Sequence, residues 1–96
     1  MKVEVLQIKL ISDFKPLRAF ANVKVGGWVI HDFRIIKQNG QRAFVNSPQV
    51  SWRDSETGDL KFKSILTIPP EEKEVIDTAI LHAWRMELEK TNASQK

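Results

Sequence analysis

Hydrophobic and polar residues alternate through the first half of the chain, and this period of two is the pattern of β-strands. The clearest stretch runs from Leu17 to Val25, where every odd-numbered residue is apolar. Strands are predicted over 2–10, 17–25, 28–37 and 42–46. Residues 60–66 are either a fifth short strand or an extended edge. The apolar positions of the first strand change parity between Val5 and Leu6, which predicts a β-bulge or a strand covered on both sides.

Two glycine-containing dipeptides mark the turns between these strands. Gly26-Gly27 supplies the positive φ that two-residue hairpins require, and Asn39-Gly40 is the strongest short hairpin signal. Consecutive strands should therefore pair antiparallel. The fourth strand stops before Pro48, and we interpret residues 47–59 as a polar loop, closed by a turn over Thr57-Gly58-Asp59.

The period changes to three and four residues after Pro69-Pro70, which are suited to the first turn of a helix. The predicted apolar stripe consists of Val75, Ile76, Ala79, Ile80, Ala83, Trp84 and Leu88. The fold class is α+β, with a four- to five-stranded antiparallel β-meander followed by one long C-terminal amphipathic helix that covers one face of the sheet. Residues 1–90 form a single domain, and the polar tail 91–96 should fray.

The strand over 28–37 predicts a second apolar face on the sheet. With strict alternation, Trp28 and Ile30 project to the side opposite Phe33, together with Phe20 of the preceding strand. Monomers seldom expose that much contiguous apolar surface. We therefore expect a homodimer that covers this face or joins edge strands.

Composition narrows the function classes. The 96 residues include no cysteine, which excludes thiolate catalysis and cysteine metal sites and fits a reducing, cytoplasmic environment. No stretch approaches the ~20 apolar residues of a membrane span. His31 and His82 have no ligand-spaced partner, so we expect His31 to be a packed, hydrogen-bonded residue and His82 to be solvated. We predict no metal, no cofactor, no membrane contact and no enzymatic activity.

Charge is distributed unevenly. Residues 1–68 contain eleven Lys or Arg and six Asp or Glu, a formal charge of +5, whereas residues 69–96 sum to −2. A basic region with a stacking aromatic is typical of nucleic-acid binding, and Trp52-Arg53 provides such a pair. The candidate contact residues are Arg53, Trp52, Arg42, Lys24, Arg34, Lys61 and Lys63. The alternative is that Trp52 folds back onto the sheet and the cations are scattered.

His31-Asp32-x-Arg34 is the densest polar cluster within an apolar strand. Neighbouring residues of a strand project to opposite sides, so His31 and Asp32 cannot act as a dyad. Asp32 and Arg34 share a side, where an ion pair is possible. We interpret the cluster as a framework element.

Several of these segments together resemble the SpoVG family, the stage V sporulation protein G or septation regulator proteins. The resemblance rests on the segments ANVKV (21–25), VIHDFRII (29–36), Asn39-Gly40 and FVNSP (44–48), and it covers about residues 1–88. It implies a small bacterial α+β protein that dimerises through its sheet and binds nucleic acid with sequence preference. It also implies regulation of transcripts tied to division, septation and cell-surface functions.

The resemblance further implies that the loop after FVNSP carries the binding. Here that loop, 49–54, contains one cation, so the binding role is carried over to Arg53, with Trp52 adding a stacking contact. Asp32 and Arg34 would orient the strand, the adjoining turn or the dimer contact.

Two functions follow as hypotheses. In the first, a homodimer binds nucleic acid, DNA in preference to RNA, through paired loops and the basic edge of the sheet. In the second, the chain is a protein-interaction module that docks a division or regulatory partner by its spare apolar face or its acidic helix.

Overall fold

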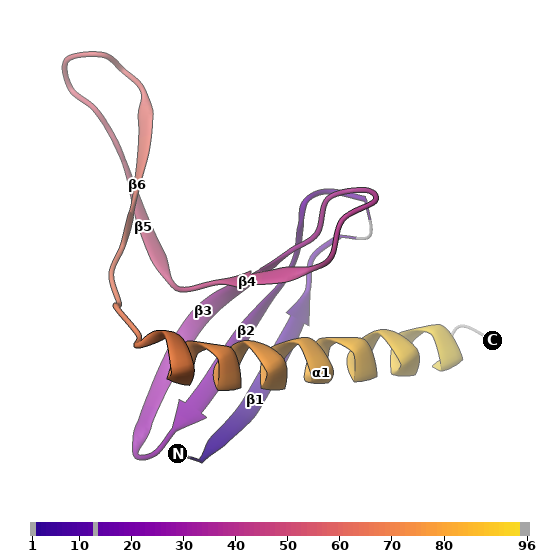
Figure 1. The fold of residues 1–96 in the computed structure, drawn as a ribbon. Helices are drawn as coiled ribbons and strands as arrows, with labels where there is room; N and C mark the ends of the chain where they lie inside the picture. The colour runs from indigo at the N-terminus through magenta and orange to yellow at the C-terminus, as the bar shows by residue number, and fades with distance from the viewer. Residues whose placement is uncertain (1, 13, 95–96) are drawn as a thin grey trace.

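The computed structural model describes residues 2–12 and 14–94, which form two antiparallel sheets and one helix (Figure 1). The elements are β1 (Val3–Leu10), β2 (Leu17–Val25), β3 (Trp28–Ile36), β4 (Phe44–Asn46), β5 (Gln49–Arg53), β6 (Leu60–Ser64) and α1 (Pro70–Ser94). The first four strands pair in the order β1-β2-β3-β4, and β5 pairs with β6 in a separate ribbon. The predicted α+β class, with a four-stranded antiparallel sheet and a long C-terminal helix, is confirmed.

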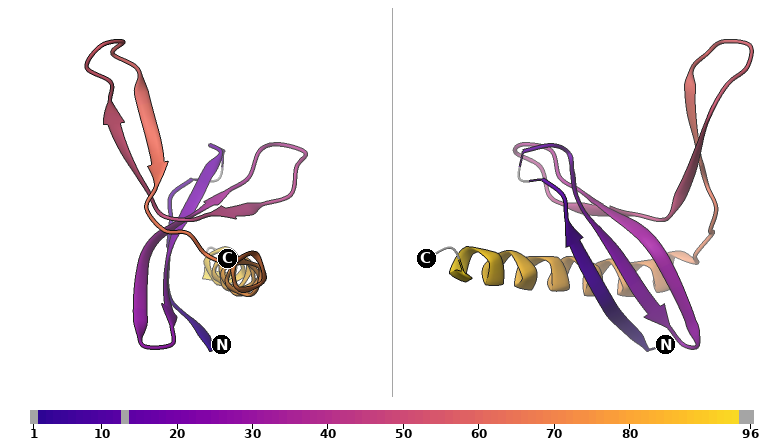
Figure 2. Two further views of the ribbon diagram at one scale, coloured as in Figure 1. Left: turned by 60° about the vertical axis from the view of Figure 1, so that its left-hand side comes forward. Right: turned by 180° about the vertical axis from the view of Figure 1, so that it is seen from behind.

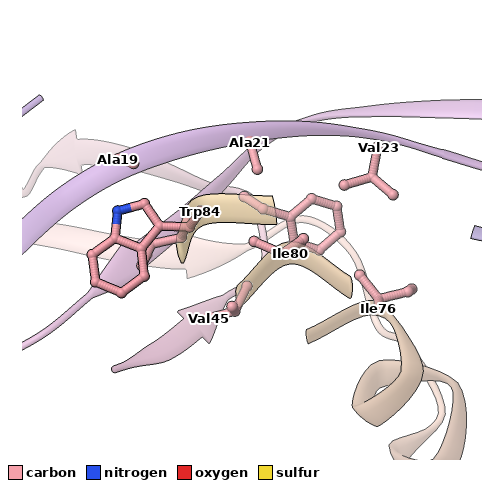
Figure 3. Close-up of a cluster of buried hydrophobic side chains, with 9 residues drawn as sticks. Ala19, Ala21, Val23, Val45, Ile76, Ile80 and Trp84 are labelled. Atoms are coloured by element: carbon pink, nitrogen blue, oxygen red, sulfur yellow. The ribbon is translucent and has the colours of Figure 1, made fainter. Parts of the chain in front are cut away.

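The core lies between α1 and one face of the four-stranded sheet (Figure 3). Small side chains in β2, including Ala19 and Ala21, let the helix approach the sheet closely, and Ile80 and Trp84 fill the space between them. Among the described residues, the buried hydrophobic cluster consists of Ala19, Ala21, Val23, Phe33, Ile35, Val45, Ile76, Ile80 and Trp84. The helix crosses β1, β2 and β4, and it lies entirely on one side of the sheet (Figure 2, left).

A lysine fastens the first turns of α1 to the sheet. The Lys73 ammonium donates to the backbone carbonyl of Val45 in β4 at 3.0 Å and to the Asp77 carboxylate at 2.7 Å. Both charged side chains are partly buried. The contact therefore holds the start of α1 against β4.

The turns and the first bulge are as predicted. Gly26, at φ +59°, joins β2 to β3, and Gly40, at φ +77°, lies in the longer connection between β3 and β4. In β1 the register shifts between Val5 and Gln7, so Leu6 is the extra residue of a β-bulge and the apolar parity changes there.

The strict alternation predicted for β3 is wrong. The register moves from Ala21↔Phe33 to Val23↔Ile30, so His31 and Asp32 form a second bulge. The extra residue reverses the parity, and Ile30 therefore packs against the core on the same face as Phe33. Trp28 lies at the end of the strand and is 79% exposed. The second face of the sheet is consequently not the apolar surface that we expected.

The interpretation of 47–59 as a polar loop is also wrong. Residues 49–64, which we call the arm, form a two-stranded ribbon that projects from the sheet (Figures 1 and 2). Neither strand has a buried residue. The molecule measures 51 × 33 × 22 Å, and its radius of gyration of 14.9 Å exceeds the ~12.5 Å expected of a compact chain of this length. The projecting arm and the 25-residue helix α1 both contribute to this extension (Figure 1).

The predicted helix stripe is mostly correct. Ile76, Ile80 and Trp84 are buried, whereas Val75 is 49% exposed because its position faces away from the sheet. His82 is exposed, as expected. The helix continues to Ser94, past Thr91 where we expected the tail to begin, and 95–96 lie outside the described residues.

Within the described part of the chain, no helix has the length and apolar character needed to cross a membrane.

Candidate nucleic-acid interface

The register of the arm places its stacking residue beside two lysines. Trp52 is the cross-strand partner of Lys61, and Val50 is the partner of Lys63. Directly opposed residues of an antiparallel pair share a face, so these four side chains form one surface, which we call the Trp52 face. Trp52 is 46% exposed. It does not fold back onto the four-stranded sheet, because the arm extends away from it.

The other side of the ribbon also carries exposed apolar side chains. Ser51 opposes Phe62, and Arg53 opposes Leu60. Phe62 and Leu60 are each about half exposed, at 53% and 51%. We call this side the Phe62 face. A two-stranded ribbon without further packing is only marginally stable in water, and these side chains provide surface that a partner could cover.

Polar contacts order the tip of the arm. Asp54 accepts a hydrogen bond from Lys61 at 2.8 Å and from the backbone N–H groups of Glu56 and Thr57 at 2.8 and 3.2 Å. The Lys61 ammonium and the two N–H groups hold the pKa of the Asp54 carboxyl below its ordinary value of 3.8. The Arg53 guanidinium donates to the carbonyl of Gly58 at 2.7 Å. Two of the arm's cations therefore help to shape the tip.

A second group of cations lies on the face of the four-stranded sheet opposite α1, which we call the open face. Lys9, Phe20, Arg34 and Asn46 are successive cross-strand partners and form one row across all four strands. The Arg34 guanidinium lies over the Phe20 ring, 5.8 Å from its centroid, a cation–π distance. Lys24 belongs to the same face, because it alternates with the buried residues of β2.

The His31–Asp32 bulge interrupts the open face. Asp32 has φ +68°, and its backbone N–H donates to Oδ1 of Asn22 at 3.2 Å. His31 is exposed, so the expectation that it is packed is wrong. The ion pair that the strand pattern made possible between Asp32 and Arg34 does not form among the described residues, and Arg34 instead lies over Phe20.

The predicted contact residues thus divide into two sites and one loop. Arg53, Trp52, Lys61 and Lys63 lie on the arm, Lys24 and Arg34 lie on the open face, and Arg42 is exposed in the connection between β3 and β4. Sequence reasoning missed Lys9, which the bulge in β1 places beside Phe20. The parity change at Leu6 was the signal that could have located it.

The basic excess belongs to the sheet and not to the arm. Residues 1–48 contain eight Lys or Arg and three Asp or Glu, which gives +5, whereas 49–64 contain three of each and are neutral. Among the described residues, no three His, Asp or Glu side chains converge on a position that could hold a metal ion.

No protein-family model, curated protein or solved structure matches this chain.

Proposed function

We propose that the chain is a nucleic-acid-binding regulatory protein that acts as a homodimer. The observation that carries the proposal is the exposed Trp52 face, where an aromatic ring and two lysines project on a ribbon that has no other role in the fold. Aromatic rings stack on bases or sugars, and lysines neutralise phosphates. The cations of the open face add a second positive surface.

The shape of the arm supports duplex DNA ahead of RNA. The major groove of B-DNA accepts a two-stranded β-ribbon, whereas the major groove of an RNA duplex is too narrow for side chains to read. Lys63 and Trp52 would approach the duplex from one side of the ribbon. The neutral charge of the arm means that the basic sheet must supply much of the long-range attraction.

The homodimer rests on the Phe62 face. Phe62 and Leu60 lie on the same side of β6 and are each about half exposed, at 53% and 51%. A second copy that covers these two side chains would place two Trp52 faces in one molecule. A hollow of about 440 Å³ at the base of the arm is not part of this contact, because it is lined by Val50 of the Trp52 face and by Asp32 of the sheet.

The regulatory role linked to septation and division comes from the resemblance to the SpoVG family, and the cytoplasmic location comes from the sequence. Both are parts of the proposal. Binding to nucleic acid should be tested first, and a search for the regulated transcripts should follow.

The direct test is a titration of random-sequence duplex DNA with the protein at several salt concentrations, in which fluorescence anisotropy measures binding. A dimer that neutralises six to eight phosphates should give a slope of log K against log salt of roughly −5 to −7. Replacing Lys63 by alanine removes two cations per dimer and should make the slope less steep by about 2.

The matched control is Lys90→Ala, which removes an exposed lysine from the far end of α1 and should leave the slope unchanged. A flat salt response of the wild-type chain would contradict nucleic-acid binding. Equal effects of Lys63→Ala and Lys90→Ala would contradict the assignment of contact to the arm.

A second candidate function is the docking of a protein partner on α1. A shallow hollow on its outer side is lined by Glu74, Val75, Thr78, Ala79 and His82, and the half-exposed Val75 has no role in the core. Retention of a purified partner at high salt, with loss of that partner in Val75→Lys and not in Lys63→Ala, would favour this function.

A further inference from the structure

A small polar hollow lies on the open face of the sheet. It has a volume of about 200 Å³ and is lined by Gln7, Lys9, Phe20, Asn22 and Asp32. Pockets that enclose drug-sized ligands measure roughly 300–1,000 Å³. This hollow is therefore suited to a single planar group rather than to a whole nucleotide.

The two bulges build the hollow. The bulge at Leu6 brings Gln7 opposite Asn22, and the bulge at His31–Asp32 brings Asp32 to the other side of Asn22. Asn22 joins them, because its side-chain N–H donates to the side-chain oxygen Oε1 of Gln7 at 3.1 Å and its Oδ1 accepts the backbone N–H of Asp32 at 3.2 Å. The floor of the hollow is fixed by these two hydrogen bonds.

The hollow is surrounded by an acidic, a basic, an amide and an aromatic side chain. Within the described chain, the Asp32 carboxylate and the Lys9 ammonium have no hydrogen-bond partner, and the Gln7 amide uses only its oxygen. Phe20 supplies a ring at the wall. The hollow therefore offers an anionic acceptor, amide and ammonium donors, and a stacking surface.

We propose that this hollow binds one unpaired guanine base of a single-stranded nucleic acid. The Watson–Crick edge of guanine presents N1–H and N2–H as adjacent donors, and O6 as an acceptor. A carboxylate can accept both donors at once, and Gln7 or Lys9 can donate to O6. Uracil offers one donor on this edge, and adenine and cytosine offer one donor group beside acceptors that a carboxylate repels.

The neighbouring cations fit the backbone of the same strand. Arg34 lies over the Phe20 ring but does not line the hollow, so its guanidinium remains available to a phosphate beside the bound base. A duplex hides the Watson–Crick edge, whereas single strands expose bases that can stack on aromatic side chains. The open face would therefore complement the arm, which suits a duplex.

This inference rests on the proposed function, because it requires that the chain bind nucleic acid. The test uses the full chain and fluorescently labelled eight-nucleotide probes. One series is oligo-U RNA with a central U, A, C or G, and a second is the corresponding oligo-T DNA series. We expect the G probe to bind about tenfold more tightly than its uniform parent in both series, the size of one bidentate base contact.

The discriminating variant is Asp32→Asn. Asparagine tolerates positive φ, so the bulge should persist, but its amide replaces one acceptor by donors. The ratio of affinities for the G probe and the uniform probe should fall to about 1. The control is Asp59→Asn at the tip of the arm, which makes the same change of charge and should leave the ratio at about tenfold.

Phe20→Leu should weaken every single-stranded probe while duplex binding is retained. Equal affinity for the four bases, or a preference that survives Asp32→Asn, would overturn the guanine site and leave duplex binding through the arm standing. Failure to bind any probe or duplex in dilute buffer would overturn the proposed function itself.

Discussion

Asp54 determines how much positive charge the arm can offer. Its carboxylate holds Lys61 at 2.8 Å while it accepts two backbone N–H groups of the tip. The lysine is thereby fixed near the tip but is partly neutralised. Lys63 has no such partner among the described residues, and for this reason we regard it as the more effective phosphate contact of the two.

The lowered pKa of Asp54 predicts how the tip responds to acid. A carboxyl whose pKa is depressed by folding stabilises the folded tip above its ordinary value of 3.8, and this stabilisation is lost as the pH falls through the folded-state pKa. The amide signals of Glu56 and Thr57 should therefore remain constant down to pH 4 and shift below it in an NMR titration.

The Lys61→Met variant tests whether Lys61 causes the lowered pKa of Asp54. Lys61 makes the largest contribution to the shift, so its removal should raise the pKa of Asp54 toward 3.8. An Asp54 carboxyl that titrates at the same pH with and without Lys61 would show that the ion pair does not form in solution.

At the scale of elements, α1 and the four-stranded sheet depend on each other. Trp84 is 7% exposed and packs in the core with Ile80 and Ala19. Its indole N–H has no hydrogen-bond partner, so the residue contributes by apolar contact and not by a polar one. The Lys73 contact with Val45 fixes the opposite end of the same interface.

Trp84→Ala should lower the free energy of unfolding by ~3–5 kcal/mol in urea denaturation, because it leaves a cavity in the helix–sheet core. Trp84→Phe should cost less, since it also removes the unpaired N–H. His82→Ala, on the exposed side of α1, should change stability by less than ~0.5 kcal/mol. A loss below ~1 kcal/mol for Trp84→Ala would mean that α1 does not pack on this sheet in solution.

The elements also show which features a sequence can predict. The strands β1 to β3, the Gly26 turn and the buried side of α1 follow from local periodicity, and the bulge at Leu6 follows from a parity change, whereas β5 was not predicted. The bulge at His31–Asp32 leaves no such signal, because Ile30 and Phe33 fit a regular strand by composition alone. The candidate contact residues could be named by charge, but their division between arm and open face depends on register and could not be predicted.

The whole molecule separates its positive charges from its negative ones. The basic residues gather on the sheet, α1 is acidic, and the half-exposed apolar side chains of the arm lie away from both. The dimer contact that we propose is therefore on the arm, and not on the second face of the sheet, from which the sequence led us to expect a dimer. That location leaves the open face accessible in the dimer that we propose.

A dimer formed through the arm makes thermal stability depend on protein concentration. Because association favours the folded state by mass action, the Tm of the wild-type chain should rise by several degrees over about a hundredfold increase in concentration. Phe62→Ser should remove this dependence without unfolding the protomer, since Phe62 is 53% exposed and outside the core. Met86→Ser, which alters a similarly exposed apolar residue on α1, should retain it. The reverse result, with the dependence lost in Met86→Ser and kept in Phe62→Ser, would move the dimer contact from the arm to the helix, and sedimentation of both variants would then give the oligomeric state directly.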